Sequence, residues 1–114
     1  KHYAMIAGGS GITPIYSMIG TILKFEPKSK ITLLYANRNS SSIIFKEKIE
    51  QWTKEFSTQL EVKHFFSEEE NPRNAIEGYI TRISLEEIVN QYDKNKLDFY
   101  LGGLKKISQI FLLI

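Results

Sequence analysis

Near the start of the chain, the segment AGGSGITP (residues 7–14) gathers three glycines, a serine, a threonine and a proline between an apolar run and an amphipathic stretch. Glycine has no Cβ, so its backbone can turn tightly and approach a ligand closely. The free N–H groups and the positive dipole at the start of a helix favour a bound anion. We therefore predict a phosphate-binding loop that leads from a strand into a helix.

Thr13 and Pro14 predict where the helix after this loop begins. Proline suits the first helical position because the N–H that it lacks would have no intrahelical partner there, and threonine is a common N-cap. The spacing Gly-x-Gly-x-x-Pro in residues 9–14 departs from the dinucleotide-binding pattern, which ends in glycine or alanine. For this motif taken by itself, a tight structural turn therefore remains an alternative to a phosphate site.

The sequence lacks other combinations of residues that would do chemistry. There are no cysteines, so disulfides, thiolate metal sites and cysteine nucleophiles are excluded. His2 and His64 have no partner at a spacing typical of a metal site or a catalytic triad, and Ser10 is not in a Gly-x-Ser-x-Gly nucleophile elbow. The net charge of +2 and the scattered lysines do not predict a nucleic-acid partner.

The chain of 114 residues, 42% hydrophobic and 25% charged, has the composition of one globular domain with a hydrophobic core. No apolar run approaches the roughly 18 residues of a membrane span, and no signal-peptide pattern opens the sequence, so we expect a cytoplasmic protein. Lys1 is followed at once by strand-like residues and the chain ends on FLLI, so both ends look like cuts through a longer protein.

Short apolar runs and segments with helical periodicity alternate along the chain. An acidic stretch at 68–77 without periodicity is predicted to be a surface loop. Predicted strands are 2–7, 31–36, 60–66 and 97–101; predicted helices are 14–23, 40–56 with N-caps among the serines at 40–42, one opened by a capping box at 84–87, and one that starts after Gly102-Gly103.

This alternation predicts an α/β fold in three layers, α/β/α, around a parallel sheet of four to five strands that is truncated at its C-terminal strand. In open parallel sheets, ligands bind beyond the carboxyl ends of the strands. Four predicted strand ends therefore surround one candidate site. These ends are residues 8–14, 37–40, 67–69 and 101–104.

These segments together resemble the nicotinamide-nucleotide-binding domain of ferredoxin-NADP reductase-type flavoproteins, especially oxygenase reductases and flavohaemoglobin-like reductases. The similarity covers nearly the whole chain. Its strongest element is AGGSGITPIYSMI, followed in the family's order and spacing by LLYANRNSSSIIFKEKIEQW, FFSEEE, EGYITRI and FYLGGLKKI.

The resemblance implies a domain that holds NADH or NADPH so that the nicotinamide passes a hydride to FAD in a preceding β-barrel domain, which this chain does not contain. It also implies electron transfer onward to a ferredoxin, iron–sulfur or haem partner. Tyr79 either contacts the nucleotide or covers the sheet edge. The cofactor-binding residues that the resemblance implies are Gly8, Gly9, Ser10, Gly11, Ile12, Thr13, Pro14, Asn37, Arg38, Ser67, Leu101, Gly102 and Gly103.

The pair Ser67-Glu68 bears on the choice of cofactor. In NADPH-specific relatives this position resembles Ser-Arg, whose guanidinium pairs with the 2′-phosphate. Glu68 would repel that phosphate, and the acidic residues at 69–70 add like charge, so the resemblance favours NADH over NADPH. Arg38, Arg73 or Arg82 would reverse this preference if one of them reached the 2′-phosphate.

The chain departs from the family at its fourth predicted strand, where the family usually has Cys-Gly beside the reactive nicotinamide carbon and this chain has Gly102-Gly103. Loss of the side chain at 102 is expected to enlarge the site and to remove a packing partner of the ring. The family's final strand is also absent, so the fourth strand is expected to have an exposed edge. The alternative function is a degenerate nucleotide-binding or interaction module without hydride transfer.

Overall fold

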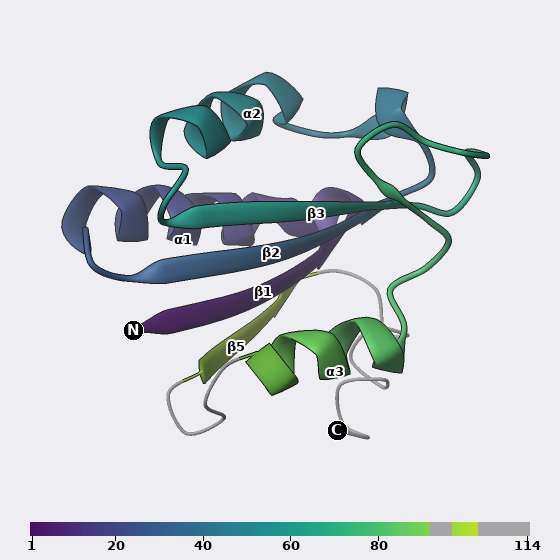
Figure 1. Ribbon diagram of the computed structural model, residues 1–114. Coiled ribbons are helices and arrows are strands. Elements are labelled where there is room, and N and C mark those ends of the chain that lie inside the picture. Colours follow the sequence, from purple (N-terminus) through teal and green to yellow (C-terminus); the bar gives the residue numbers. More distant parts are fainter. Residues whose placement is uncertain (92–96, 103–114) are drawn as a thin grey trace.

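A computed structural model describes residues 1–91 and 97–102, which form one parallel five-stranded sheet in the order β4-β3-β2-β1-β5. Helices α1 and α2 cover one face of this sheet and α3 covers the other (Figure 1), which confirms the predicted three-layer α/β fold. The strands are β1 (His2–Gly8), β2 (Lys30–Asn37), β3 (Leu60–Phe66), β4 (Ile76–Glu77) and β5 (Leu97–Gly102); the helices are α1 (Ile12–Phe25), α2 (Lys46–Glu55) and α3 (Arg82–Gln91), with 3-10 turns η1 (Gly9–Gly11) and η2 (Ser40–Ser42).

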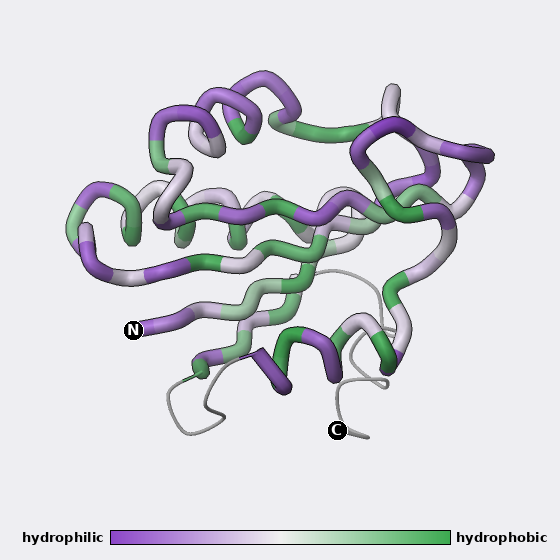
Figure 2. Tube along the Cα trace, in the orientation of Figure 1, coloured by the Kyte–Doolittle hydropathy of each residue, from purple (hydrophilic) through white to green (hydrophobic). Residues whose placement is uncertain are grey.

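Strand β1 lies in the centre of the core, and all seven of its residues are buried. Met5 and Ala7 face the layer of α1 and α2, whereas Ala4 and Ile6 face α3. A strand that is covered on both faces needs a continuous apolar run, which is the pattern of this segment. Figure 2 shows hydrophobic residues where β1 and β2 pass between the helices, and hydrophilic residues along the outside of α2.

The sheet differs from the prediction at one edge. Strand β3 has the predicted bounds, but the short strand β4 lies in the stretch 68–77, which the sequence predicts to be a loop. A strand of two residues, both exposed, has no periodicity that a sequence pattern can show. At the other edge, β5 pairs only with β1 among the described residues, as expected for a strand with an open edge. The predicted helix after Gly102-Gly103 lies outside the described residues.

Helix α1 begins before its predicted start at Pro14. The turn η1 runs directly into the helix with Gly11 as the N-cap, so the prediction that Thr13 is the N-cap is wrong. Pro14 is tolerated within the first turn because the first four N–H groups of a helix have no intrahelical partner. The buried face of α1 consists of Ile12, Ile15, Ile19, Ile22 and Leu23.

Helix α2 begins later than predicted, because the serines at 40–42 form the separate turn η2. Phe45 lies between the two elements with a φ of 62°, a left-handed conformation that a right-handed helix cannot contain. The Tyr35 hydroxyl fixes this segment to β2, since it donates to the Ile44 carbonyl at 3.0 Å and accepts from the Ile44 N–H at 3.1 Å. The helix therefore starts only at Lys46.

Helix α3 has its capping contacts three positions before the predicted capping box. Ser84 N–H donates to the Thr81 hydroxyl at 3.4 Å, and Thr81 N–H donates to the Ser84 hydroxyl at 3.3 Å. Ser84 is therefore a residue of the first turn, and the prediction that it is the N-cap is wrong. The shift leaves Leu85, Ile88 and Val89 buried against the sheet.

Candidate functional site

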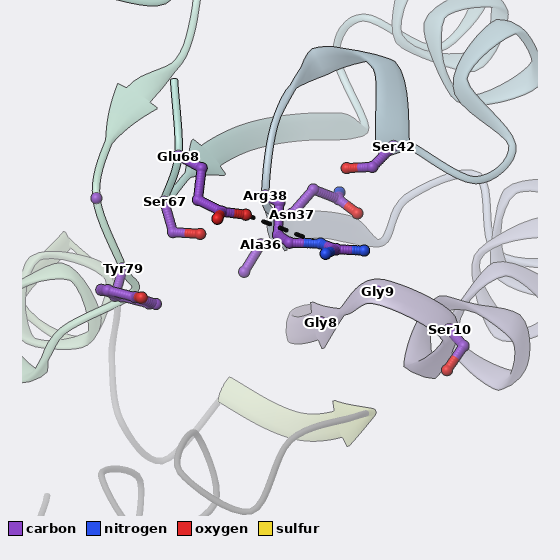
Figure 3. A pocket seen from close by; sticks show the side chains of 11 residues that line it. Gly8, Gly9, Ser10, Ala36, Asn37, Arg38, Ser42, Ser67, Glu68 and Tyr79 are labelled. Atoms are coloured by element: carbon purple, nitrogen blue, oxygen red, sulfur yellow. Dashed lines mark ion pairs between the residues drawn. The ribbon is translucent and has the colours of Figure 1, made fainter. Parts of the chain in front are cut away.

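A pocket of about 580 Å³ lies at the carboxyl ends of β1, β2 and β3. The strand order changes direction at β1, which has β2 on one side and the last described strand, β5, on the other. Ligands bind at such points in open parallel sheets. Figure 3 shows the glycine-rich loop facing the segments that follow β2 and β3. The pocket is lined by Gly8, Gly9, Ser10, Ala36, Asn37, Arg38, Ser42, Ser67, Glu68, Gly78 and Tyr79.

The glycine-rich loop turns at Gly9, whose φ of 52° is left-handed. Glycine adopts this conformation freely, whereas another residue would be strained by about 1 kcal/mol or more. Helix α1 follows directly, and no side chain makes a capping hydrogen bond at its N-cap, Gly11. A helix start without a capping side chain, reached through a glycine turn, suits an anionic group of a ligand.

Asn37, at the end of β2, is the buried polar residue of the pocket wall. The residue is only 8% exposed, and its enclosed Nδ2 makes no hydrogen bond of good geometry within the described part of the chain, although the side chain interacts with the Tyr35 hydroxyl. A buried donor without a partner costs about 1–3 kcal/mol. Because Nδ2 is enclosed, a ligand in the pocket would reach it only if the Asn37 side chain turned toward the pocket.

Backbone hydrogen bonds join the two segments of this wall beyond the ends of their strands. Ser67 N–H donates to the Asn37 carbonyl at 3.1 Å, and Glu68 N–H donates to the Arg38 carbonyl at 2.8 Å. These bonds continue the pairing of β2 with β3 into the loops. These hydrogen bonds therefore fix the two loop backbones to each other, and with them the positions from which the side chains extend.

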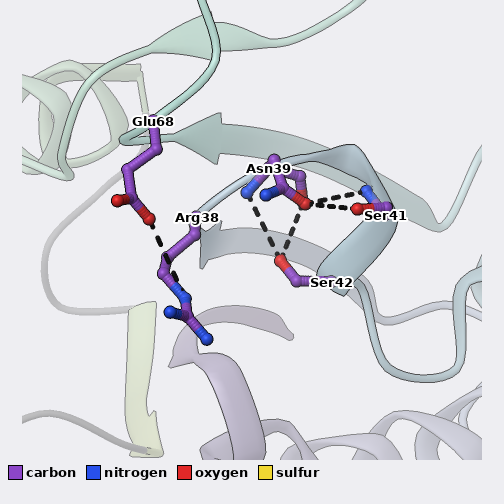
Figure 4. Close-up of polar contacts among 5 residues, drawn as sticks. All are labelled: Arg38, Asn39, Ser41, Ser42 and Glu68. Atoms are coloured by element: carbon purple, nitrogen blue, oxygen red, sulfur yellow. Dashed lines mark hydrogen bonds and ion pairs between the residues drawn. The ribbon is translucent and has the colours of Figure 1, made fainter.

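Arg38 and Glu68 bring opposite charges to the pocket. Their side chains point toward each other in Figure 4, with 3.9 Å between Arg38 Nε and Glu68 Oε2, and they are 79% and 60% exposed. An ion pair that is long and exposed contributes little to stability. Figure 3 shows the guanidinium of Arg38 extending toward the loop at Gly9. Both groups are therefore available to a ligand.

Glu69 does not add a free carboxylate to the pocket. Its Oε1 accepts hydrogen bonds from the backbone N–H of Ser40 at 3.0 Å and from the Ser40 hydroxyl at 2.9 Å. Asn39 caps the same turn, because its side-chain oxygen accepts from Ser41 N–H at 3.1 Å (Figure 4). Glu69 therefore does not line the pocket, and its predicted repulsion of a 2′-phosphate is weakened. Glu68 does line the pocket.

Tyr79 lies on the pocket wall across from the glycine-rich loop and is 73% exposed (Figure 3). The turn before it requires Gly78, which has a φ of 108° and donates its N–H to the Phe66 carbonyl at 2.8 Å. An exposed aromatic face beside a pocket offers a stacking surface to a planar ring. Of the two roles predicted for Tyr79, its position fits the ligand contact.

Gly102 does not leave the space that the sequence predicts. A Cβ added there would lie 2.2 Å from the carbonyl oxygen of Gly11, a distance that real Cβ atoms essentially never show. The loop backbone fills the volume of the missing side chain. The expectation that a glycine at this position enlarges the site is therefore wrong.

The structure brings six of the predicted site residues into the pocket wall, namely Gly8, Gly9, Ser10, Asn37, Arg38 and Ser67. It does not bring in Gly11, Ile12, Thr13, Pro14, Leu101 and Gly102, and Gly103 lies outside the described residues. Ile12 has no exposed surface and packs in the core. The sequence patterns do not identify Ala36, Ser42 or Gly78, of which only Ser42 carries a polar group that could have pointed to the pocket.

The pocket offers hydrogen-bond donors, one cation, one carboxylate and an aromatic face, which together suit binding of a charged ligand with a planar ring. In residues 1–91 and 97–102, no group of three or more histidines and carboxylates is placed to hold a metal ion. No helix in the same ranges is long and apolar enough to cross a membrane.

A family model described as an oxidoreductase NAD-binding domain matches residues 5–111. The chain is 33% identical over 107 residues to nitrate reductase [NADH] 1 of Oryza sativa subsp. japonica, covering 90% of this chain and 12% of that protein. It is 30% identical over 103 residues to NADH-cytochrome b5 reductase 2-B of Vanderwaltozyma polyspora, covering 86% of this chain and 34% of that protein. The chain thus spans about a third or less of these relatives.

Among solved structures, the fold matches the cytochrome b5 reductase domain of Ulva prolifera nitrate reductase with a TM-score of 0.81 and 25% identity. The match covers 96% of this chain and 40% of that one. The architecture and the predicted family resemblance are both confirmed by these comparisons.

Proposed function

The chain belongs to the oxidoreductase NAD-binding domain family, and we propose on that basis that it binds NADH and presents the nicotinamide to a flavin. The flavin, FAD, would be held by another domain of the same protein. Bound NADH supplies a hydride, that is, two electrons and a proton, to the flavin. The residues of this chain contribute binding and orientation.

The observation that carries the proposal is the pocket at the carboxyl ends of β1, β2 and β3, which the glycine turn lines together with Arg38 and Tyr79. A dinucleotide supplies the diphosphate that suits the glycine turn and the start of α1. The face of Tyr79 suits the adenine ring. The residues that line the pocket therefore fit a nicotinamide dinucleotide.

We propose NADH rather than NADPH as the cofactor because Glu68 lines the pocket and its negative charge would repel a 2′-phosphate. Its carboxylate can accept hydrogen bonds from ribose hydroxyls. Arg38, the cation of the pocket wall, lies 3.9 Å from the Glu68 carboxylate, whose charge offsets part of the attraction of Arg38 for a 2′-phosphate. The names of the two curated relatives also specify NADH.

We propose a haem protein as the final electron acceptor, because the relatives include a cytochrome b5 reductase and nitrate reductases. A ferredoxin or another iron–sulfur protein is the acceptor that the sequence resemblance also allows. A cytoplasmic location belongs to the same proposal and is tested by cell fractionation. These statements concern a protein longer than this chain.

Calorimetric titration of the chain with NADH and NADPH tests the cofactor. We expect NADH to bind more tightly, and we expect a Gly9→Val variant to lose binding, because it strains a left-handed residue and places a side chain in the pocket. Gly20→Ala is the matched control, since it adds a methyl group in α1 that would lie 3.4 Å from Trp52, away from the pocket. No heat with either cofactor would refute the proposal.

Hydride transfer needs a second experiment on a protein that includes the FAD-binding domain. Stopped-flow absorbance should show bleaching of the flavin after NADH is mixed in without oxygen. A flavin that stays oxidised although NADH binds would favour the alternative, a nucleotide-binding module without hydride transfer.

A further inference from the structure

Strand β5 ends directly against the glycine-rich loop. Gly102 pairs with Ala7 of β1, two residues before the turn η1 begins. A Cβ at Gly102 would lie not only 2.2 Å from the Gly11 carbonyl oxygen but also 2.9 Å from Ile15 Cγ1 and 3.2 Å from the Gly11 carbonyl carbon. The strand and the loop are therefore in direct contact, which only glycine allows.

The atoms that meet Gly102 cannot move away cheaply. Gly11 is the last residue of η1 and the N-cap of α1, so its carbonyl is part of the backbone that starts the helix. Ile15 is 2% exposed and packs in the core of the α1 layer. A side chain at 102 would have to displace η1 with the start of α1, or separate β5 from β1, because a close-packed interior transmits such strain.

The same turn forms part of the pocket wall. Gly9 and Ser10 line the pocket, and both belong to η1 together with Gly11. The turn is short and closed by backbone hydrogen bonds from Ile12 N–H to the Gly9 and Ser10 carbonyls. A shift of Gly11 therefore carries the pocket-lining residues with it.

We propose that Gly102 is a positioning residue of the nucleotide site. Because Gly102 carries no side chain, η1 can pack directly against β5. This contact keeps Gly9 and Ser10 in the pocket wall. This inference rests on the proposed function and deepens it, since the packing of η1 against β5 sets the affinity for the cofactor. Gly102 itself touches the loop and acts on the ligand only through it.

The test compares Gly102→Ala with Gly20→Ala, which adds the same methyl group to a glycine of α1 that does not line the pocket. We expect the NADH dissociation constant of Gly102→Ala to rise roughly tenfold or more, as a displaced loop loses hydrogen bonds to the diphosphate. In ¹⁵N–¹H spectra without ligand, the amide signals of residues 9–11 should shift in Gly102→Ala. Gly20→Ala should change neither readout.

The outcomes separate this inference from the proposed function. If the unmodified chain does not bind NADH, the proposed function fails. If it binds NADH and Gly102→Ala binds equally well with unshifted signals at 9–11, the positioning role is overturned. A purely structural glycine would lower the melting temperature of Gly102→Ala and leave the NADH affinity of the folded protein unchanged, which also overturns it.

A second measurement on the unmodified chain applies if Gly102→Ala does not fold. The contact predicts a nuclear Overhauser effect between the Hα protons of Gly102 and the side-chain protons of Ile15. It also predicts that the Gly102 amide signal shifts during NADH titration together with that of Ser10. Absence of either effect contradicts the proposed packing of η1 against β5.

Discussion

At the scale of single residues, Asn37 places a buried polar group in the pocket wall. Its Nδ2 makes no hydrogen bond of good geometry among the described residues, and its side chain interacts with the Tyr35 hydroxyl. A buried donor that is poorly paired costs free energy. The sequence could show an asparagine after a strand, but not that its amide is buried, because that depends on how β2, β3 and the loop pack together.

Replacing Asn37 with leucine should stabilise the chain and weaken cofactor binding. The substitution keeps a similar volume and removes the unpaired donor, so we expect the free energy of unfolding to rise by about 1 kcal/mol. Urea denaturation and NADH titration measure the two effects. Asn90→Leu, the same change on the exposed side of α3, is the control. A less stable Asn37→Leu variant with unchanged NADH affinity would contradict the assigned role.

Replacing Glu68 with glutamine should shift the cofactor preference toward NADPH. The variant removes a carboxylate from the pocket wall and leaves Arg38 without the opposite charge that lies 3.9 Å away. One charge interaction at about 4 Å in water amounts to roughly 1 kcal/mol, so the NADPH dissociation constant should fall about fivefold. Titrations at matched ionic strength measure it, and Glu55→Gln at the end of α2 controls for net charge. An unchanged NADPH affinity would exclude Glu68 from the choice of cofactor.

At the scale of elements, the sequence predicts the strands better than the helix starts. Strands β1, β2, β3 and β5 agree within about one residue at each end because their apolar runs are bounded by polar or turn residues. All three described helices start elsewhere than predicted. The turn η1 runs directly into α1, the serines at 40–42 form a separate turn before α2, and Thr81 rather than Ser84 precedes α3. Tertiary contacts contribute to these starts, as the hydroxyl of Tyr35 does before α2.

Replacing Tyr35 with phenylalanine tests this tether. The hydroxyl both donates to and accepts from the backbone of Ile44, so its removal leaves a donor and an acceptor unmet. We expect a loss of about 1–3 kcal/mol in the free energy of unfolding, measured with urea, and faster hydrogen exchange at the Ile44 amide. Tyr16→Phe, which removes a hydroxyl from a stacked ring on α1, is the comparison. Equal stability of the two variants would show that the tether is unimportant.

At the scale of the whole molecule, the sequence predicts the layers, the parallel sheet and the edge of the sheet that holds the site. Alternating elements and a glycine-rich loop are local patterns, and the topology of parallel sheets restricts how they combine. The contact of Gly102 with Gly11 and Ile15 joins distant parts of the chain at the distance of a single methyl group, and no local pattern contains it. Six of the thirteen predicted site residues therefore line the pocket.

The two histidines should make the stability of the whole molecule depend on pH. Burial lowers the pKa of His64 and of His2 below the ordinary value of 6.5. As the pH falls, the histidines of the unfolded chain therefore take up protons before those of the folded chain. The stability that the two neutral histidines contribute is present above about pH 6.5 and is lost as the pH falls toward the pKa values of the folded chain. Each histidine contributes at most about 1.4 kcal/mol per pH unit in that window.

Urea denaturation between pH 8 and 5 measures this dependence. The free energy of unfolding should decrease below about pH 6.5, and His64→Asn and His2→Asn should each flatten the decrease. A double variant that keeps the full slope would assign the effect to other groups.

The strand order has a consequence for synthesis on the ribosome. Strand β1 is made before β5, one of its two neighbours in the sheet, by about 90 residues of chain. Until then, one edge of the most buried strand has no backbone partner, and the loop that follows it has no Gly102 to rest on. We therefore expect that edge of β1 to stay unpaired, and the glycine-rich loop to lack its contact with Gly102, until residues 97–102 have left the exit tunnel.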